Sequence, residues 1–222
     1  MTNLIEIVQQ DVFAFLRSNK ELLFNERDFQ MHLATWLRNS SNSYDDVDVE
    51  YYIPKGILKH YVWNRELRLD IVVKKDGEYC PIELKYKTKK LKRKISRFDE
   101  ILKDEVVVMK NQGAQDLGMY NFWKDIRRLE LVRNQFNRVK GGLAVFVTND
   151  FFYVKGSKST SNNYLFNISE GKHDIFKHWK NEESACAMRD EYKSFEVEYK
   201  YTIHWDDVFV DEEKFYYCIV KI

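Results

Sequence analysis

The sequence is poor in proline, cysteine and long apolar runs. It contains only 2 Pro and 3 Cys among 222 residues. The cysteines, Cys80, Cys186 and Cys218, are scattered and lack the close spacing of zinc ligands. Such a set argues against a disulfide framework, so we expect a reduced, cytoplasmic protein. No apolar run approaches the ~20 residues of a membrane span. The first residues also lack the features of a signal peptide, so we expect no membrane association.

Several catalytic motifs are missing as well. The chain has no GxxxxGK[ST] loop, which argues against ATP-driven chemistry, and no GxSxG nucleophile elbow. Its 5 histidines form no convincing zinc-binding pattern. The net charge of +1 neither favours nor excludes nucleic acid, because the distribution of charge matters more than its sum. With 44% hydrophobic and 15% aromatic residues, the chain has ample material for a folded core.

Helical spacing of apolar residues dominates the first forty residues. One helix is predicted to begin near Leu4 and end near Ser18. A second is predicted to begin after Asn25, a residue suited to capping a helix N-terminus. The apolar face predicted for this second helix comprises Phe29, Leu33, Trp36 and Leu37.

Strand patterns follow. Alternation predicts a strand over 47–53, and two further strands over 67–73 and 80–86 joined by a hairpin at 74–77. A long helix is predicted from about Gln112 to Asn134, with a core face of Met119, Phe122, Trp123, Ile126 and Leu129. The apolar run 143–148 suits a strand buried on both faces and entered in parallel. Beyond it we expect strands at 195–203 and 214–220, and a helix near 176 or 186–192.

Three charged residues in the two central strands are the strongest functional signal. Because side chains alternate along a strand, Glu83 and Lys85 share one face, opposite Cys80, Ile82, Leu84 and Tyr86. In the partner strand, Leu67, Leu69, Ile71 and Val73 are expected to form one apolar face, with Asp70 pointing the other way. Pairing of these strands would bring two carboxylates and one ammonium together, a set suited to a divalent metal and a water. The alternative is a surface salt bridge on a solvated sheet.

This pattern, an Asp followed by Glu-x-Lys on adjoining strands, resembles the PD-(D/E)xK nuclease superfamily, with Leu69-Asp70 in place of Pro-Asp. The resemblance implies an α/β fold with a restriction-endonuclease-like core. That core would span 26–150 in αβββαβ order, as a mixed central sheet flanked by helices. Residues 1–25 would form a helix packed on the core, and 151–222 a C-terminal α+β extension or sheet elaboration.

The resemblance also implies an activity. Mg²⁺ or Mn²⁺ would be held by Asp70, Glu83 and the main-chain carbonyl of Leu84, for hydrolysis of phosphodiester bonds. Lys85 would orient or help deprotonate the attacking water, although its reference pKa of ~10.4 would have to shift for a base role. DNA is the implied substrate, with RNA not excluded, in defence, restriction or repair.

Further acids and a helix motif complete the implied site. Glu26 is expected to be the third acid, with Gln30 one turn later and Glu50 on the first strand as its rival. Many superfamily members carry a Gln and a Tyr four apart on the later helix. Here Gln115 precedes Tyr120 by five, so the match is partial. Asp116, Tyr120, Lys124 and Arg127 are predicted to form one polar stripe.

A dense basic run follows Lys85 and comprises Lys87, Lys89, Lys90, Lys92, Arg93, Lys94 and Arg97. One interpretation is a solvated loop. The other is an arm that contacts phosphates beside the metal site, gaining affinity by counterion release. Together with Tyr120, Lys124 and Arg127, this run supplies the expected nucleic-acid contacts. The rival function is a catalytically silent nuclease-like fold used as a nucleic-acid-binding or protein-interaction module. The sequence leaves open whether the protein is a monomer or a homodimer.

Overall fold

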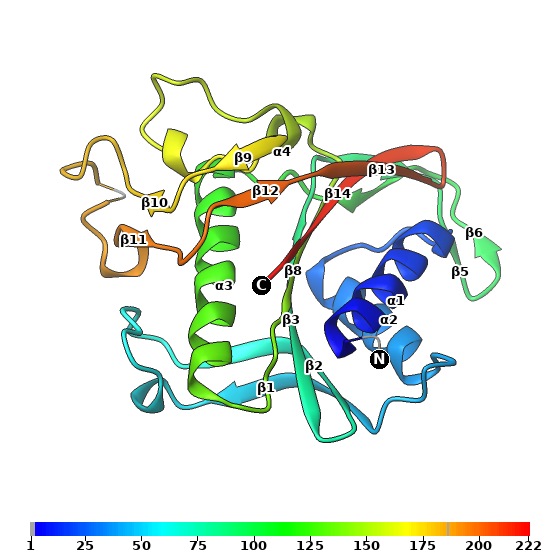
Figure 1. Ribbon diagram of the computed structural model, residues 1–222. Helices are drawn as coiled ribbons and strands as arrows, with labels where there is room; N and C mark the ends of the chain where they lie inside the picture. The colour runs from blue at the N-terminus through cyan, green and yellow to red at the C-terminus, as the bar shows by residue number, and fades with distance from the viewer. Residues whose placement is uncertain (1–2, 186) are drawn as a thin grey trace.

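The computed structural model describes residues 3–185 and 187–222 and shows an α/β fold with a mixed central sheet flanked by helices (Figure 1). The sheet has the strand order β1-β2-β3-β8-β14-β13. Neighbouring strands are antiparallel except β3 and β8, which are parallel. The strands span β1 Asp46–Ile53, β2 Leu67–Lys75, β3 Glu78–Lys87, β8 Leu143–Thr148, β13 Trp205–Val210 and β14 Glu213–Lys221.

Helices cover both faces of this sheet. Helices α1 (Leu4–Ser18) and α2 (Glu26–Arg38) pack on one face, and α3 (Gln115–Gln135) packs on the other (Figure 1). The Asn25 side chain accepts a hydrogen bond from the Asp28 N–H, which confirms the predicted start of the second helix. The expectation for Trp36 was wrong, because this side chain is 39% exposed at the edge of the α1–α2 pair. Its ring meets Phe15 edge-on and does not enter the core.

The predicted hairpin between β2 and β3 is confirmed. Lys75 pairs with Glu78, and the two intervening residues, Asp76 and Gly77, have φ values of 51° and 77°. Two left-handed residues in a two-residue loop match the twist of antiparallel strands, and glycine adopts this conformation readily.

The expected single apolar face of β2 was wrong. Leu67 and Leu69 pack in the core on the α3 side of the sheet, whereas Ile71 and Val73 pack in the core under α1 and α2. The change of side occurs around Asp70, and Glu50, opposite it in register, has a φ of 54°. A left-handed residue interrupts the regular alternation of its own strand, β1, and β2 changes side at the same level of the sheet, so the two-residue period is broken in both strands here.

Helix α3 is buried on both sides. Its predicted core face is confirmed, since Met119, Phe122, Trp123, Ile126 and Leu129 are all buried. Its other side is covered by the segment between α4 (Phe151–Lys155) and β13. The predicted polar stripe was therefore wrong for Tyr120, which is fully buried, and for Lys124, which is 9% exposed. Helix α3 begins at Gln115, three residues later than expected.

The C-terminal part is a sheet extension together with a covering segment. Strand β14 pairs with β8, and the last residue exchanges two main-chain hydrogen bonds with Gly142. The predicted strand at 195–203 is two short strands, β11 Phe195–Glu196 and β12 Tyr201–Ile203, which pair with β10 Phe176–Lys177 and β9 Gly171–His173. Residue 176 is thus in a strand, not a helix. Residues 190–192 form one 3₁₀ turn, and residue 186 lies outside the described residues.

The basic run after β3 folds into small antiparallel pairs. Strand β4 (Leu91–Arg93) pairs with β7 (Val106–Met109), and β5 (Ser96–Arg97) pairs with β6 (Glu100–Ile101). The run is therefore partly paired into short strands, while Lys90, Lys92 and Lys94 are exposed to solvent. Of the residues described, no helix is long and apolar enough to cross a membrane.

A buried lysine under α3 gives the first prediction. Lys177 is 1% exposed, its ammonium lies 3.3 Å from the centre of the Trp123 ring, and burial lowers its pKa to about 7. Because the pKa is lowered on folding, the unfolded chain binds more protons between about pH 7 and 10.5. Stability should therefore rise with pH across this window, by at most about 1.4 kcal/mol per unit. Urea unfolding of the wild-type protein and Lys177→Met at several pH values measures this, and only the wild-type protein should show this contribution.

Candidate active site

The candidate site lies where β2 and β3 separate. Their last pair is Ile71 with Ile82, so β3 has no strand neighbour on this side beyond that point. Two carboxylates satisfy its main chain instead. The Leu84 N–H donates to Asp70 Oδ2 at 2.6 Å, and the Tyr86 N–H donates to Glu26 Oε2 at 2.9 Å. The gap between the strands is therefore lined by acids from β2 and α2.

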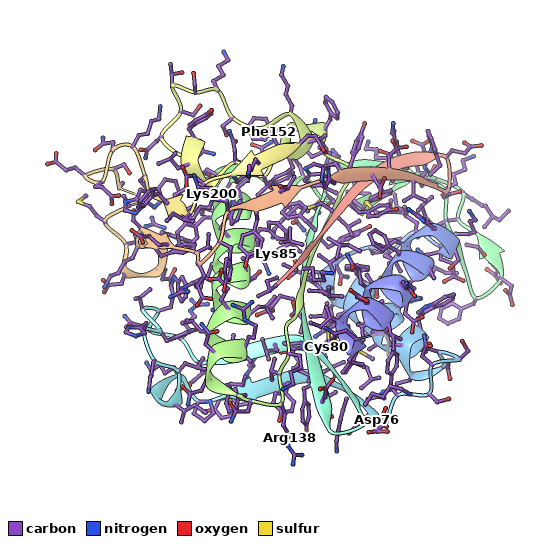
Figure 2. The ribbon with its side chains drawn as sticks, in the orientation of Figure 1. Asp76, Cys80, Lys85, Arg138, Phe152 and Lys200 are labelled. Carbon is purple, nitrogen blue, oxygen red and sulfur yellow. The ribbon has the colours of Figure 1, made fainter. Side chains whose placement is uncertain are left out.

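Strand alternation places the remaining site groups. Leu84 and Tyr86 pack in the core under α1 and α2, so Glu83 and Lys85 point toward α3, as expected. Lys85 lies near the middle of the molecule, between α3 and the sheet (Figure 2). Asp70 and Glu83 lie one residue beyond that last pair, and each affects the pKa of the other. The structure thus brings Glu26, Asp70, Glu83 and Lys85 together.

Two residues of α3 that the sequence analysis missed complete this cluster. Asp125 Oδ2 lies 2.6 Å from Lys85 Nζ, and Arg128 Nη1 lies 3.3 Å from Asp125 Oδ1. Asp125 is buried, as are its helix neighbours Phe122 and Ile126. A charged residue within the apolar face of the predicted helix was the available signal, because buried charges need partners.

The electrostatics of the cluster are dominated by burial and by neighbouring carboxylates. Burial raises the pKa of Asp70, against the opposing effects of Lys85 and the Leu84 N–H. Burial, helped by Asp125 and Asp70, raises the pKa of Glu83 well above its usual range.

Lys85 shows the opposite balance. Burial lowers the pKa of Lys85, but the surrounding carboxylates, Asp125 first, outweigh this effect and raise it overall. Its ammonium therefore stays charged at neutral pH and also donates to the Leu84 carbonyl at 2.8 Å. This arrangement suits a positioning cation and does not suit a general base.

Among the carboxylates on the strands of the cluster, Glu83 has a buried oxygen without a partner in the described chain. Glu83 Oε1 is buried and accepts no hydrogen bond from any described residue. Together with Asp70 and the Leu84 carbonyl, it offers oxygen ligands of the kind that Mg²⁺ and Mn²⁺ prefer. These oxygens fit a divalent cation, although no group of three or more His, Cys, Asp or Glu side chains in the described chain is arranged to hold a metal ion. A cation here would rely on the main-chain carbonyl as well.

Gln30 and Glu50 form a supporting contact. The Gln30 side-chain amide donates to Glu50 Oε1 at 3.1 Å and to the Asp70 carbonyl at 2.7 Å. Gln30 therefore ties α2 to β2 beside Asp70. Glu50 is exposed and engaged with Gln30, whereas Glu26 reaches the β3 main chain, so Glu26 is the better placed of the two acids.

Other predicted site residues lie elsewhere. Gln115 donates to Asp150 beyond β8, and Arg127 pairs with Glu130 and Glu198. Tyr120 bonds Trp63 and the Lys193 carbonyl beneath the C-terminal segment, so its expected contact with nucleic acid is wrong.

Lys124 is the member of the stripe that stays near the cluster. Its ammonium lies 5.1 Å from the centre of the Trp63 ring. Burial and the neighbouring Arg128 lower its pKa to about 8.

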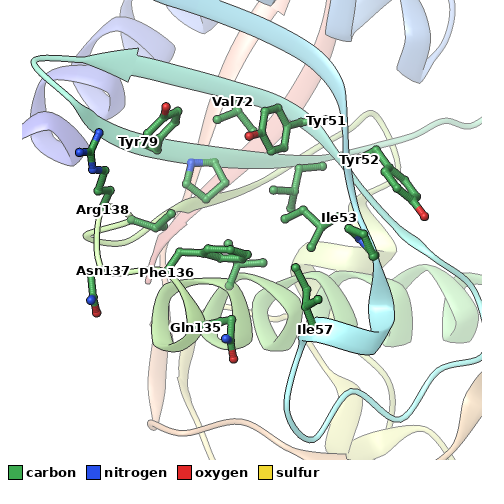
Figure 3. A pocket seen from close by; sticks show the side chains of 15 residues that line it. Tyr51, Tyr52, Ile53, Ile57, Val72, Tyr79, Gln135, Phe136, Asn137 and Arg138 are labelled. Carbon is green, nitrogen blue, oxygen red and sulfur yellow. The ribbon is translucent and has the colours of Figure 1, made fainter.

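An apolar cavity of about 480 Å³ lies outside the cluster (Figure 3). It is formed by β1 to β3 and the end of α3, and its wall includes Tyr51, Ile57, Tyr79, Phe136 and Arg138. Its lining contains none of the clustered carboxylates or Lys85. This apolar cavity and the charged cluster are therefore separate features.

Comparison with known proteins adds no relative to this picture. No family model, no curated protein and no solved structure matches the chain.

The Glu83 carboxylate, with its partnerless oxygen Oε1, gives the second prediction. The pKa of Glu83 is raised above its value of 4.5 in the unfolded chain. The contribution of protonated Glu83 to folding stability is therefore complete below pH 4.5, and it is lost as pH rises through the pKa of the folded state. In metal-free buffer at neutral pH, Glu83→Gln should therefore stabilise the protein, by about 1–3 kcal/mol. Thermal unfolding in excess chelator measures the change. Added Mn²⁺ should then stabilise the wild-type protein and not the variant.

The matched control is a second buried glutamate. Glu130 is fully buried and burial raises its pKa as well, but it accepts hydrogen bonds from Arg127, the Glu198 N–H and Tyr201, which oppose that rise. Glu130→Gln should lower stability, by about 1–3 kcal/mol, because its partners lose a charged acceptor. Equal effects of the two substitutions would contradict the assignment of a distinct electrostatic role to Glu83.

Proposed function

We propose that the protein is a metal-dependent nuclease with a restriction-endonuclease-like core, acting on DNA. The observation that carries this proposal is the gap between β2 and β3. There, Asp70 accepts from the Leu84 N–H, Glu26 accepts from the Tyr86 N–H, and Lys85 donates to the Leu84 carbonyl. Glu26, Asp70 and Glu83 all act on the pKa of Lys85, and three acids and a lysine gathered in this way form a set suited to phosphodiester hydrolysis.

The order of elements supports the proposed core. From Glu26 to Thr148 the large elements are α2, β1, β2, β3, α3 and β8, with the small strands β4 to β7 inserted before α3. This matches the αβββαβ order that the resemblance implied. The parallel pairing of β3 with β8 brings the acidic strand to the middle of the sheet, where α2 and α3 can both reach it.

Asp70, Glu83 and the Leu84 carbonyl would hold Mg²⁺ or Mn²⁺. When bound, such an ion supplies Lewis-acid polarisation of the phosphate and a more acidic water. Glu26, already fixed on the Tyr86 N–H, would lie on the other side of the same gap.

The chain's own groups define the remaining roles. The Lys85 ammonium, kept charged by its carboxylate neighbours, would orient the attacking water or stabilise developing charge on the phosphate. Asp125 would hold Lys85 in place, and Arg128 would hold Asp125. A base role for Lys85 is not favoured, because its pKa is raised.

Nucleic acid would be held by the exposed lysines of β4 and its flanks. Lys89 and Arg93 pair with Asp150 and Glu213, while Lys90, Lys92 and Lys94 are exposed. The proposed setting is the cytoplasm, in defence, restriction or repair. A homodimer and an RNA substrate stay as alternatives, and the cleavage assay below includes RNA.

A second candidate function is a catalytically silent nuclease-like module that binds nucleic acid or protein. The Lys85–Asp125 ion pair favours it, because an ammonium already neutralises charge inside the carboxylate cluster. Metal-dependent cleavage distinguishes the two functions.

The third prediction concerns cleavage. Asp70→Asn and Glu83→Gln should abolish Mg²⁺- or Mn²⁺-dependent cleavage of DNA while the proteins stay folded. Lys85→Ala should lose turnover but keep stabilisation by Mn²⁺, and Glu26→Gln should reduce activity. Cleavage of labelled duplex and single-stranded DNA, with RNA in parallel, measures this. Glu50→Gln is the matched control, because this exposed carboxylate should matter less than Glu26. Full activity of the Asp70 variant would refute the proposed site.

The fourth prediction separates binding from chemistry. The parent protein carries Asp70→Asn. Replacement of three lysines by Gln, at Lys90, Lys92 and Lys94, should weaken its binding to DNA of any sequence to the same extent. Each lost duplex-phosphate contact should flatten the log–log salt slope by roughly 0.9. The control is the Lys89→Gln, Arg93→Gln pair, whose cations already have carboxylate partners and should change the slope less. An unchanged slope in the triple variant would place the phosphate contacts elsewhere.

A further inference from the structure

The hairpin formed by β5 and β6, residues 96–101, presents apolar side chains to solvent. Phe98 at its tip is 98% exposed, and Ile101 is 77% exposed. The hairpin extends from the edge of the molecule beyond α1 and α2 (Figure 1). Scattered exposed apolar residues are common, but an almost fully exposed aromatic ring at the end of a projecting hairpin suggests a contact surface.

The backbone at the tip is also unusual. Phe98 and Asp99 have φ values of 53° and 65°, between the paired residues Arg97 and Glu100. Two-residue loops of this kind favour Asn or Asp followed by Gly, and a bulky residue with positive φ is an outlier. The tip therefore keeps a large apolar ring in a position that favours a small polar residue. A backbone outlier of this kind points to function more than to stability.

The base of the hairpin is anchored to the body. Leu91 packs against the core under α1 and α2, and Arg93 pairs with Glu213 and donates to the Asp211 carbonyl. The Arg97 guanidinium lies 5.0 Å from the centre of the Phe24 ring. Phe24 is two residues before Glu26, so the hairpin is fixed beside the start of α2, the helix that supplies an acid to the proposed site.

The charge of residues 87–101, the arm that ends in this hairpin, indicates the class of partner. Residues 87–101 contain 7 basic side chains and 2 acidic ones, Asp99 and Glu100. Glu100 stands opposite Arg97 in register. Lys90, Lys92 and Lys94 are exposed at alternate positions leading toward the tip. A basic arm that ends in an exposed aromatic ring complements a polyanion with stacked bases, since cations contact phosphates and rings stack on bases.

We propose that this hairpin is a wedge that enters duplex DNA, with Phe98 inserted at a base step while the lysines of the arm contact flanking phosphates. This inference rests on the proposed nuclease function and adds how the substrate is deformed. Insertion of an apolar side chain unstacks a base step and kinks the duplex. Because flexible pyrimidine–purine steps unstack most easily, the wedge would favour such steps without reading base edges.

The test uses full-length Glu83→Gln protein and a duplex that carries 2-aminopurine at a central pyrimidine–purine step. Binding should raise the 2-aminopurine fluorescence, because unstacking relieves its quenching. Phe98→Ala should abolish the rise and weaken binding by about tenfold, at an unchanged salt slope. Phe98→Asn should do the same. Asn suits the left-handed tip better than Phe, so a loss in this variant cannot reflect an unfolded hairpin. Phe209→Ala, at another exposed aromatic on β13, is the matched control and should behave as the parent.

Three results would overturn the wedge. In the first, the protein binds duplex tightly and cleaves it with metal, but the fluorescence does not rise and Phe98→Asn behaves as the parent. This result would remove the wedge and leave the nuclease proposal standing. Absence of both binding and cleavage in the wild-type protein would remove both. In the third, the protein self-associates in sedimentation, and either Phe98→Asn or Tyr51→Ala, in the cavity of Figure 3, abolishes the association. Phe98 would then bind in the cavity of a second copy of the chain and not in DNA.

Discussion

Strands β2 and β3 separate beyond the pair formed by Ile71 and Ile82, and the rest of the site depends on this constraint. A strand that loses its neighbour inside a folded core leaves main-chain N–H groups that need acceptors. Here the acceptors are the carboxylates of Asp70 and Glu26. The same gap holds both acids in fixed positions and keeps them close to Glu83 and Lys85. The cluster is thus a consequence of sheet geometry as well as of composition.

Charge balance decides what this cluster can do. Lys85 remains an ammonium because its carboxylate neighbours outweigh the effect of burial on its pKa. Asp125 and Arg128 extend the alternation of charges across the interface with α3. Glu83 keeps one oxygen without a hydrogen-bond partner among the residues described. A partly satisfied buried cluster costs stability, which is common where a site is organised for ligands or chemistry and uncommon in cores selected for packing alone.

Local patterns determined much of the fold. The caps and apolar spacing of the first two helices, the 74–77 hairpin, the core face of α3 and the buried strand at 143–148 all depend on short-range chemistry, and the structure contains them. The sequence also indicated that Glu83 and Lys85 share a face, because a strand has a two-residue period. The role of these residues in metal binding and catalysis stays a prediction.

Tertiary structure alone decided the rest. The change of side along β2 lies level with a left-handed residue of the neighbouring strand β1, and the burial of Tyr120 depends on a segment more than forty residues away. The partnership of Lys85 with Asp125 joins a strand to a helix that pattern analysis treats separately. Periodicity reports which face of an element is apolar. It does not report which distant charge or covering segment meets that face, because such contacts arise only when the elements pack.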